Sequence, residues 1–166
     1  NLRKLYFRKD RVGIPKCKIN KKIIKRDMAW CDDPKHKKYN EEIKTKNKNL
    51  KENLHRKDHK YDYIISISHN EKKTPGKGSA VFIHLTDNYK PTAGCIALKK
   101  KDFEILLKLI DKKSKIKIKK NCFLGIDSYV YSINSCGLNF RNESRFVLPY
   151  LAGYEWRYCS CCFIEF

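Results

Sequence analysis

The sequence has no lysine in its last 46 residues, although lysine is the commonest residue before that point. All thirty lysines lie at or before Lys120, and that part of the chain carries a surplus of 21 positive charges. The part after Lys120 carries one net negative charge. Such a change is not expected within one domain of uniform composition. We therefore expect a domain over residues 1–120 and a lysine-free tail over residues 121–166.

The sequence also has no apolar run long enough to cross a bilayer, and no signal peptide is recognisable in it. Its 166 residues, 41% of them hydrophobic and 34% charged, are enough for a globular core. Because the first residue is Asn1 and not Met, it stays open whether an upstream segment was removed or never recorded. The missing signal peptide therefore says little about the compartment.

The cysteines lack the spacing of a zinc site. The C-x-C-C spacing of the tail is not a C-x-x-C pair, and no histidine follows it. A zinc site is therefore poorly supported, and the role of the tail stays open. Five of the eight cysteines lie in this tail: Cys122, Cys136, Cys159, Cys161 and Cys162.

The residue pattern predicts a mainly β fold. Residues 2–12 fit an exposed strand followed by a loop, and residues 28–40 an irregular loop. Residues 41–60, polar and rich in lysine and asparagine, fit either a solvated helix or a flexible surface segment. Strands are expected over residues 61–68, 79–85 and 115–119, where β-branched, aromatic or alternating residues occur.

One helix is expected near residues 102–110. Asp102 is a candidate N-cap, because its short polar side chain can accept a hydrogen bond from the first helical turn. The next apolar residues recur at helical spacing and form one face. They are Phe103, Leu106, Leu107 and Ile110.

His84 and Cys95 are the residues most suited to chemistry. His84 ends an apolar strand, and Cys95 follows Gly94 after a connection that one loop can fold back. A thiol needs a base to become a thiolate near neutral pH, and backbone amides to stabilise an oxyanion. Glycine before the cysteine permits close approach of the backbone. From the residues alone, a buried cysteine and a structural histidine remain the commoner alternative.

The stretch over residues 78–107, with His84 ahead of Thr92-Ala93-Gly94-Cys95, resembles the signature region of the L,D-transpeptidase catalytic domain (YkuD-like) family. A subgroup of that family also carries an upstream WCDDP…YN element. The residues that match this element are Trp30, Cys31, Asp32, Asp33, Pro34, Tyr39 and Asn40.

The resemblance covers roughly residues 5–120 and implies a YkuD-like β-sandwich or barrel with one short helix after the catalytic cysteine. Several strands normally precede the equivalent of Leu2 in this family, so we expect a domain that is incomplete at its N-terminus. Many members carry histidine at the position of Ala93 and arginine at that of Ala97. These departures put the placement of the substrate in question.

The implied reaction is acyl transfer on peptidoglycan stem peptides in the periplasm or cell envelope, without a cofactor. Cys95 is the expected nucleophile and His84 its base, and the amides of Gly94 and Cys95 are the expected oxyanion donors. Weaker expectations assign substrate binding to a further set of residues, for which turn-forming or packing roles are the alternative. This set is Thr92, Trp30, Asp32, Asp33, Tyr39 and Asn40.

Other functions stay open at this stage. With water as the acceptor, the same site would act as an L,D-carboxypeptidase. A net charge of +20 also suits a nucleic-acid-binding protein. However, the lysines are spread along the chain and arginine, the usual base-reading residue, is scarce, so nucleic acid is the less favoured partner. An inactive, truncated relative is the remaining alternative.

Overall fold

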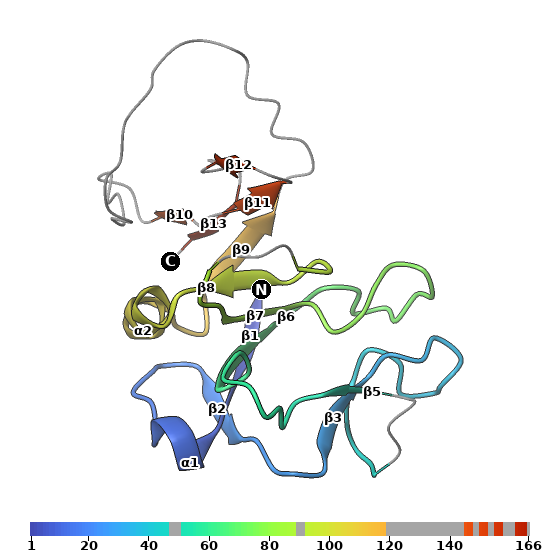
Figure 1. Ribbon diagram of the computed structural model, residues 1–166. Helices are drawn as coiled ribbons and strands as arrows, with labels where there is room; N and C mark the ends of the chain where they lie inside the picture. Colours follow the sequence, from blue (N-terminus) through green and yellow to red (C-terminus); the bar gives the residue numbers. More distant parts are fainter. Residues whose placement is uncertain are drawn as a thin grey trace.

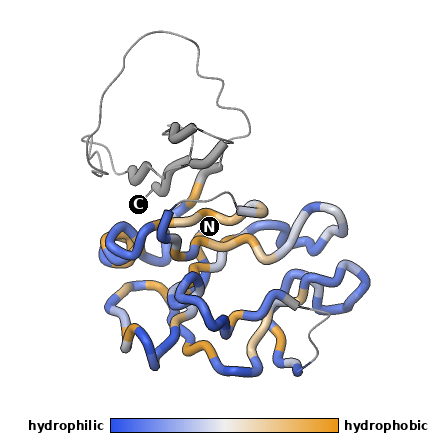
Figure 2. Tube along the Cα trace, viewed as in Figure 1, coloured by the Kyte–Doolittle hydropathy of each residue, from blue (hydrophilic) through white to orange (hydrophobic). Residues whose placement is uncertain are grey.

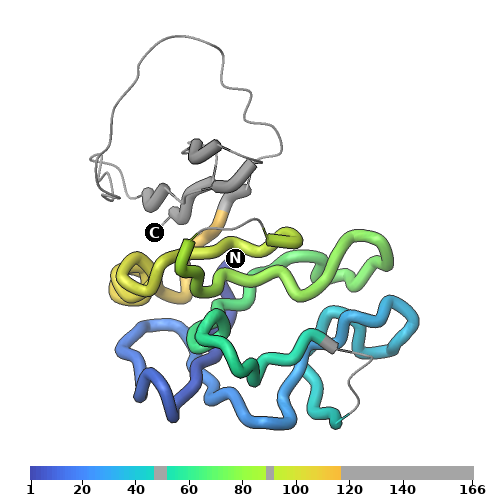
Figure 3. The backbone as a smooth tube through the Cα atoms, viewed as in Figure 1, coloured from blue at the N-terminus to red at the C-terminus, as the bar shows by residue number. Residues whose placement is uncertain are grey.

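The protein is described by a computed structural model (Figure 1). The structure describes residues 1–46, 51–88 and 92–118, together with the backbone of four strand segments at 145–147, 150–152, 155–157 and 162–165. Figure 3 traces the backbone of the first three of these ranges in colour. The predicted boundary near Lys120 lies outside the described residues and stays a prediction.

Within these residues the fold is mainly β, as expected from the sequence. There are two helices, α1 (Lys9–Val12) and α2 (Lys100–Leu109). The strands are β1 (Leu2–Phe7), β2 (Asn20–Ile23), β3 (Met28–Cys31), β4 (Glu42–Lys44), β5 (Lys51–Asn53), β6 (Tyr63–Ile67), β7 (Phe82–Leu85), β8 (Ile96–Leu98), β9 (Lys115–Ile118), β10 (Arg145–Val147), β11 (Tyr150–Ala152), β12 (Glu155–Arg157) and β13 (Cys162–Glu165).

The largest sheet has five strands in the order β2-β1-β6-β7-β8. The pairs β1–β6 and β6–β7 are antiparallel, whereas β1–β2 and β7–β8 at the two ends are parallel. A second sheet has the order β4-β3-β5, and both of its pairs are antiparallel. Smaller sheets join β10-β13-β9 and β11-β12.

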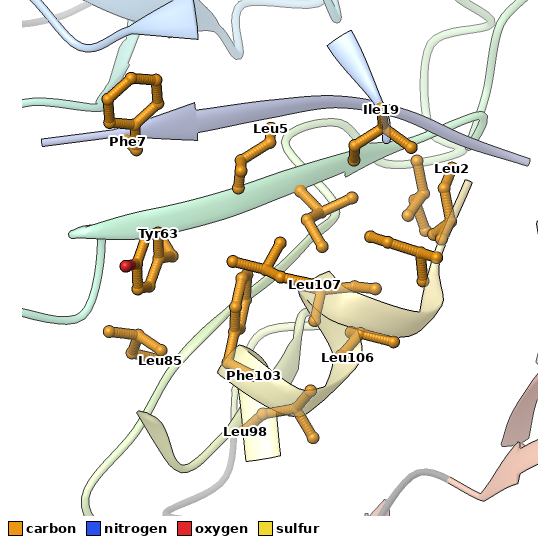
Figure 4. Packing of buried hydrophobic residues seen from close by; sticks show 14 residues of the cluster. Leu2, Leu5, Phe7, Ile19, Tyr63, Leu85, Leu98, Phe103, Leu106 and Leu107 are labelled. Carbon is orange, nitrogen blue, oxygen red and sulfur yellow. The ribbon is translucent and has the colours of Figure 1, made fainter. Parts of the chain in front are cut away.

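Each face of the five-stranded sheet carries its own core. On one face, α2 packs on the sheet, and we call this cluster the helix-side core. Figure 4 shows Phe103 and Leu107 of α2 on the side of the helix that faces Leu5 and Tyr63 of the sheet, and Leu106 belongs to the same cluster. All four apolar residues of the predicted helical face are buried, so that prediction is confirmed.

The other face packs against the second sheet, and we call this cluster the inter-sheet core. It contains Tyr6, Ile64 and Phe82 from the five-stranded sheet, and Met28 from β3. Figure 2 shows hydrophobic stretches along the paired strands and hydrophilic stretches in the outer loops. The two packed sheets give the β-sandwich character expected for the fold.

Three sequence predictions about local structure were wrong. The first strand is not exposed, because β1 lies between β2 and β6 and buries Leu2, Leu5, Tyr6 and Phe7. Residues 28–40 are not wholly irregular, because β3 occupies their first four positions. Residues 41–60 are neither a helix nor an irregular segment throughout, because β4 and β5 pair with β3 there.

The predicted helix exists but begins earlier than expected. Its first residue is Lys100 and its N-cap is Lys99, so Asp102 lies in the first turn and is not the cap. A carboxylate in the first turn is favourable at the positive end of the helix dipole, which explains why aspartate suits this position as well. The strands predicted over residues 61–68, 79–85 and 115–119 are confirmed as β6, β7 and β9.

Replacing Phe103 by alanine tests the helix-side core. Phe103 is fully buried and its ring stacks on Tyr63 with 5.4 Å between centroids. The substitution should lower the free energy of unfolding by about 3–5 kcal/mol, because it removes buried surface and leaves a cavity. Urea denaturation measures the change. The control is Lys101→Ala on the exposed side of α2, expected to change stability by less than about 0.5 kcal/mol. Equal losses in the two variants would contradict the assignment.

Candidate active site

The parallel pairing of β7 with β8 places the two candidate catalytic residues on one face of the sheet. Its register sets Ile83 opposite Ile96 and His84 opposite Ala97. Side chains alternate along a strand, so Cys95, two positions before Ala97, belongs to the face that carries His84. The packing agrees, because Cys95 contacts the inter-sheet core, which contains Phe82 and Tyr61. A two-residue offset across neighbouring strands separates Cβ atoms by roughly 8 Å, a span that an imidazole and a thiol can close.

His84 is arranged as a neutral base. Its side chain is buried, and Nδ1 lies 2.8 Å from the carbonyl oxygen of Leu85. Because a carbonyl only accepts, Nδ1 carries the proton and Nε2 keeps a free lone pair. Burial lowers the pKa of His84, and the hydrogen bond to Leu85 only partly opposes that effect. Near neutral pH the imidazole is therefore uncharged and able to accept a proton.

Cys95 is arranged as a protonated thiol. It is half-buried, and Sγ donates to the carbonyl oxygen of Ala80 at 3.3 Å. Burial raises the pKa of the Cys95 thiol, a hydrogen bond from the Phe82 backbone amide lowers it, and the charge of Glu52 raises it further. In this structure the thiol proton is directed at Ala80 and not at His84. A thiol in this environment does not ionise unaided near neutral pH, so attack requires a base.

The loop before Cys95 is shaped by Thr92 and Gly94. The Thr92 hydroxyl donates to the Cys95 carbonyl oxygen at 2.6 Å and closes the turn. Gly94 has φ of 109°, a conformation that L side chains rarely adopt, although an added Cβ would meet no atom within 4 Å. The backbone conformation, and not lack of space, therefore requires glycine before the cysteine.

Asn40 links the upstream motif to the strand that carries His84. Its Oδ1 accepts from Trp30 Nε1 at 2.9 Å and from the Ala80 amide at 3.2 Å. Its Nδ2 donates to the carbonyl oxygens of His69 at 2.9 Å and Asn70 at 3.0 Å. The side chain amide thus has two donated and two accepted bonds within the protein. Asn40 thus binds the amide of Ala80, the residue whose carbonyl oxygen accepts the hydrogen bond from the Cys95 thiol.

The remaining residues of the upstream motif lie in packing and turn positions. Trp30 is half-buried and meets Phe82 edge-on at 5.1 Å between centroids, and Tyr39 is buried. The Asp33 carboxylate accepts a hydrogen bond from the Lys35 backbone amide at 2.9 Å and so forms an Asx turn. Asp32 is exposed and accepts from the Ser79 hydroxyl, which ties this loop to the segment before β7.

Three residues beside the pair were missed by sequence reasoning: Glu52, Arg56 and Tyr61. The Tyr61 ring lies 5.4 Å from the His84 ring between centroids, and Arg56 lies 4.8 Å over the Tyr61 ring. Their segment is rich in lysine and resembles a solvated surface. One signal was available, since Arg56 is the sole arginine between Arg26 and Arg141 in a chain that otherwise uses lysine.

Within the described ranges, no group of three or more His, Cys, Asp or Glu side chains is placed to hold a metal ion. None of the helices described there has the length and hydropathy to cross a membrane.

Comparison with known proteins identifies one family. The family model described as the L,D-transpeptidase catalytic domain (YkuD) matches residues 16–118. The match spans the upstream motif, β7, the Thr92–Cys95 segment and α2. No curated protein and no solved structure gives a significant match to the chain.

Replacing Asn40 by alanine tests its linking role. The variant loses four hydrogen bonds and also places alanine at φ of 56°, so stability should fall by about 1–3 kcal/mol for each buried group left unsatisfied. Urea denaturation measures the loss. Asn20→Ala on exposed strand β2 is the control and should be nearly neutral. A similar small change in both variants would show that Asn40 does not hold this region together.

Proposed function

We propose a reaction for this chain, which belongs to the L,D-transpeptidase catalytic domain family. The family comprises enzymes of the L,D-transpeptidase type that act on peptidoglycan, generally in the cell envelope. Our proposal is that this chain transfers acyl groups between peptidoglycan stem peptides through a thioester on Cys95, and that it does so in the cell envelope. The observation that supports it most is the shared face of Cys95 and His84, set by the register of β7 and β8.

In the first half of the reaction the Cys95 thiol turns from Ala80 towards His84. Nε2 of His84 takes the thiol proton, and sulfur attacks the carbonyl carbon of the diamino acid that precedes a terminal D-alanine. The C–N bond to D-alanine breaks, and His84 returns the proton to the leaving amine. The acyl group is then held as a thioester on Cys95.

The second half reverses these roles. An amine from a second stem peptide attacks the thioester, His84 takes one of its protons, and the thiolate leaves and is protonated again. The product is an amide crosslink, and no redox partner is needed. The backbone amides of Gly94 and Cys95 are our candidates for stabilising both tetrahedral oxyanions, because Gly94 leaves the backbone open at this point.

The substrate-binding roles expected for the upstream motif fit the geometry unevenly. Asp32 is exposed and is therefore the member best placed to meet a substrate amine. The side chains of Asn40 and Trp30 are hydrogen-bonded to each other, so we propose that both residues maintain the shape of the site. Thr92 shapes the loop through the Cys95 carbonyl group. The excess of lysine gives a basic surface suited to anionic cell-wall polymers.

Labelling with a carbapenem tests the nucleophile. An acylating β-lactam of this type should add once, and peptide mass mapping should place the adduct on Cys95. Cys95→Ala should abolish both the adduct and transfer on a tetrapeptide stem while leaving the fold intact. Cys31→Ala, which removes a fully buried cysteine, is the control and should keep the adduct. An unchanged transfer rate in Cys95→Ala would exclude the mechanism.

His84→Ala tests the base. The rate of transfer should fall by about 10²–10⁴-fold, the range for loss of a general base. His69→Ala is the matched control, because His69 bonds the Lys77 carbonyl oxygen in the loop before β7 and takes no part in the reaction. Rates are followed by release of D-alanine. Equal rates in the two variants would remove His84 from the mechanism.

The products decide between crosslinking and hydrolysis. With a tetrapeptide stem and an acceptor amine, an L,D-transpeptidase gives a crosslinked dimer and D-alanine. An L,D-carboxypeptidase gives tripeptide and D-alanine whether or not the amine is present. Mass spectrometry of the products, with and without the acceptor, distinguishes them, and we expect the dimer.

A further inference from the structure

Tyr61 contacts the candidate base and packs with the candidate nucleophile in the same core. Its ring meets the His84 ring at 5.4 Å between centroids and the Phe82 ring at 6.3 Å. Cys95 packs against the inter-sheet core, to which Tyr61 belongs. Tyr61 is itself buried, so its ring limits how far the imidazole can turn. No step of the proposed reaction uses this residue.

Arg56 is held over Tyr61 by two carboxylates. Its guanidinium carbon lies 4.8 Å from the centre of the Tyr61 ring, a cation–π distance. It makes two-pronged contact with Asp58, through Nη2 to Oδ2 at 2.7 Å and Nε to Oδ1 at 3.1 Å. Nη1 also reaches Glu52 Oε1 at 3.3 Å. These contacts fix a positive charge beside the site.

Glu52 supplies the opposite charge from β5, where it pairs with Trp30 of β3. Its carboxylate acts on the Tyr61 phenol, on His84 and on Cys95, and it raises the pKa of each group. Arg56 and Lys60 act on His84 in the opposite direction and lower its pKa. The charged groups that influence the pair are thus Glu52, Arg56 and Lys60.

We infer that Glu52 and Arg56, arranged around Tyr61, are positioning residues that set the protonation of the Cys95–His84 pair. This inference rests on the proposed function, because it takes these two residues as the reacting pair. Burial is the main reason that the pair rests as a thiol and a neutral imidazole, the form in which His84 can accept the proton. Glu52 adds to the preference for the thiol, and Arg56 adds to the preference for the neutral imidazole and opposes the effect of Glu52 on His84.

The pH dependence of thiol alkylation tests this without any turnover. The full chain is treated with iodoacetamide across the neutral and alkaline range, and peptide mass spectrometry follows Cys95 and Cys17 separately. Glu52→Gln keeps the shape of the side chain and removes its charge. Alkylation of Cys95 should then begin at lower pH and be about three- to tenfold faster at neutral pH. Arg56→Gln should move the alkylation profile of Cys95 to higher pH, because the guanidinium group no longer offsets the negative charge of Glu52.

Two controls accompany the measurement. Cys17 lies beside Lys21, away from this cluster, and its profile should stay unchanged in every variant. Glu104→Gln on α2 removes a charge near Lys100 and should leave Cys95 unchanged. Circular dichroism checks the fold of each variant, and the inference requires that the two variants shift the Cys95 profile in opposite directions.

The inference is overturned if Cys95 keeps its profile in the folded variants, if both shift it in the same direction, or if Glu104→Gln shifts it equally. Failure of both variants to fold would also count against it, because the cluster would then be a structural element. Carbapenem labelling separates the two proposals. The expected alkylation shifts without an adduct on Cys95 would end the proposed function and leave only the effect of Glu52 and Arg56 on the Cys95 thiol.

Discussion

The parallel hydrogen bonding of β7 with β8 is the constraint on which the candidate site depends. His84 and Cys95 are eleven positions apart, and the register brings them to one face by pairing His84 with Ala97. A slip of one residue would turn Cys95 to the helix-side core, away from His84. The register is stabilised by apolar residues on the opposite face of the same strands, where Ile83, Leu85 and Leu98 are buried.

The second sheet completes that face. Aromatic rings from both sheets meet edge-on, with Trp30 of β3 between Tyr6 and Phe82. Asn40 extends this contact into the backbone by binding both the Trp30 indole and the Ala80 amide. A segment far upstream of Cys95 therefore binds the backbone of Ala80, the residue whose carbonyl oxygen accepts from the Cys95 thiol. This contact links the two separated motifs at the candidate site.

Sequence patterns predicted the elements whose apolar residues recur at a clear period. The strand at β6 and the buried face of α2 were of this kind. The pairing of His84 with Cys95 as base and nucleophile stays a prediction, although the strand register gives both residues the same face. The sequence predicts an exposed strand at β1 because two of its residues are basic, although four of its positions are buried. β4 and β5 are three residues long, too short for alternation to register among lysines and asparagines. The placement of Glu52 and Arg56 around Tyr61 could not be predicted, because Glu52 is positioned by the pairing of β5 with β3 and not by any local pattern.

The hydrogen bond from Cys95 to Ala80 has a consequence for the lifetime of the protein. Thiolates, and not thiols, are the species that peroxides convert to sulfenic acid. Family members work in the cell envelope, where oxidants are more abundant than in the reducing cytosol. A cysteine whose thiol stays hydrogen-bonded to a carbonyl oxygen until a substrate arrives spends little time as a thiolate. The geometry that delays ionisation thus also protects from oxidation the sulfur atom on which the proposed reaction depends.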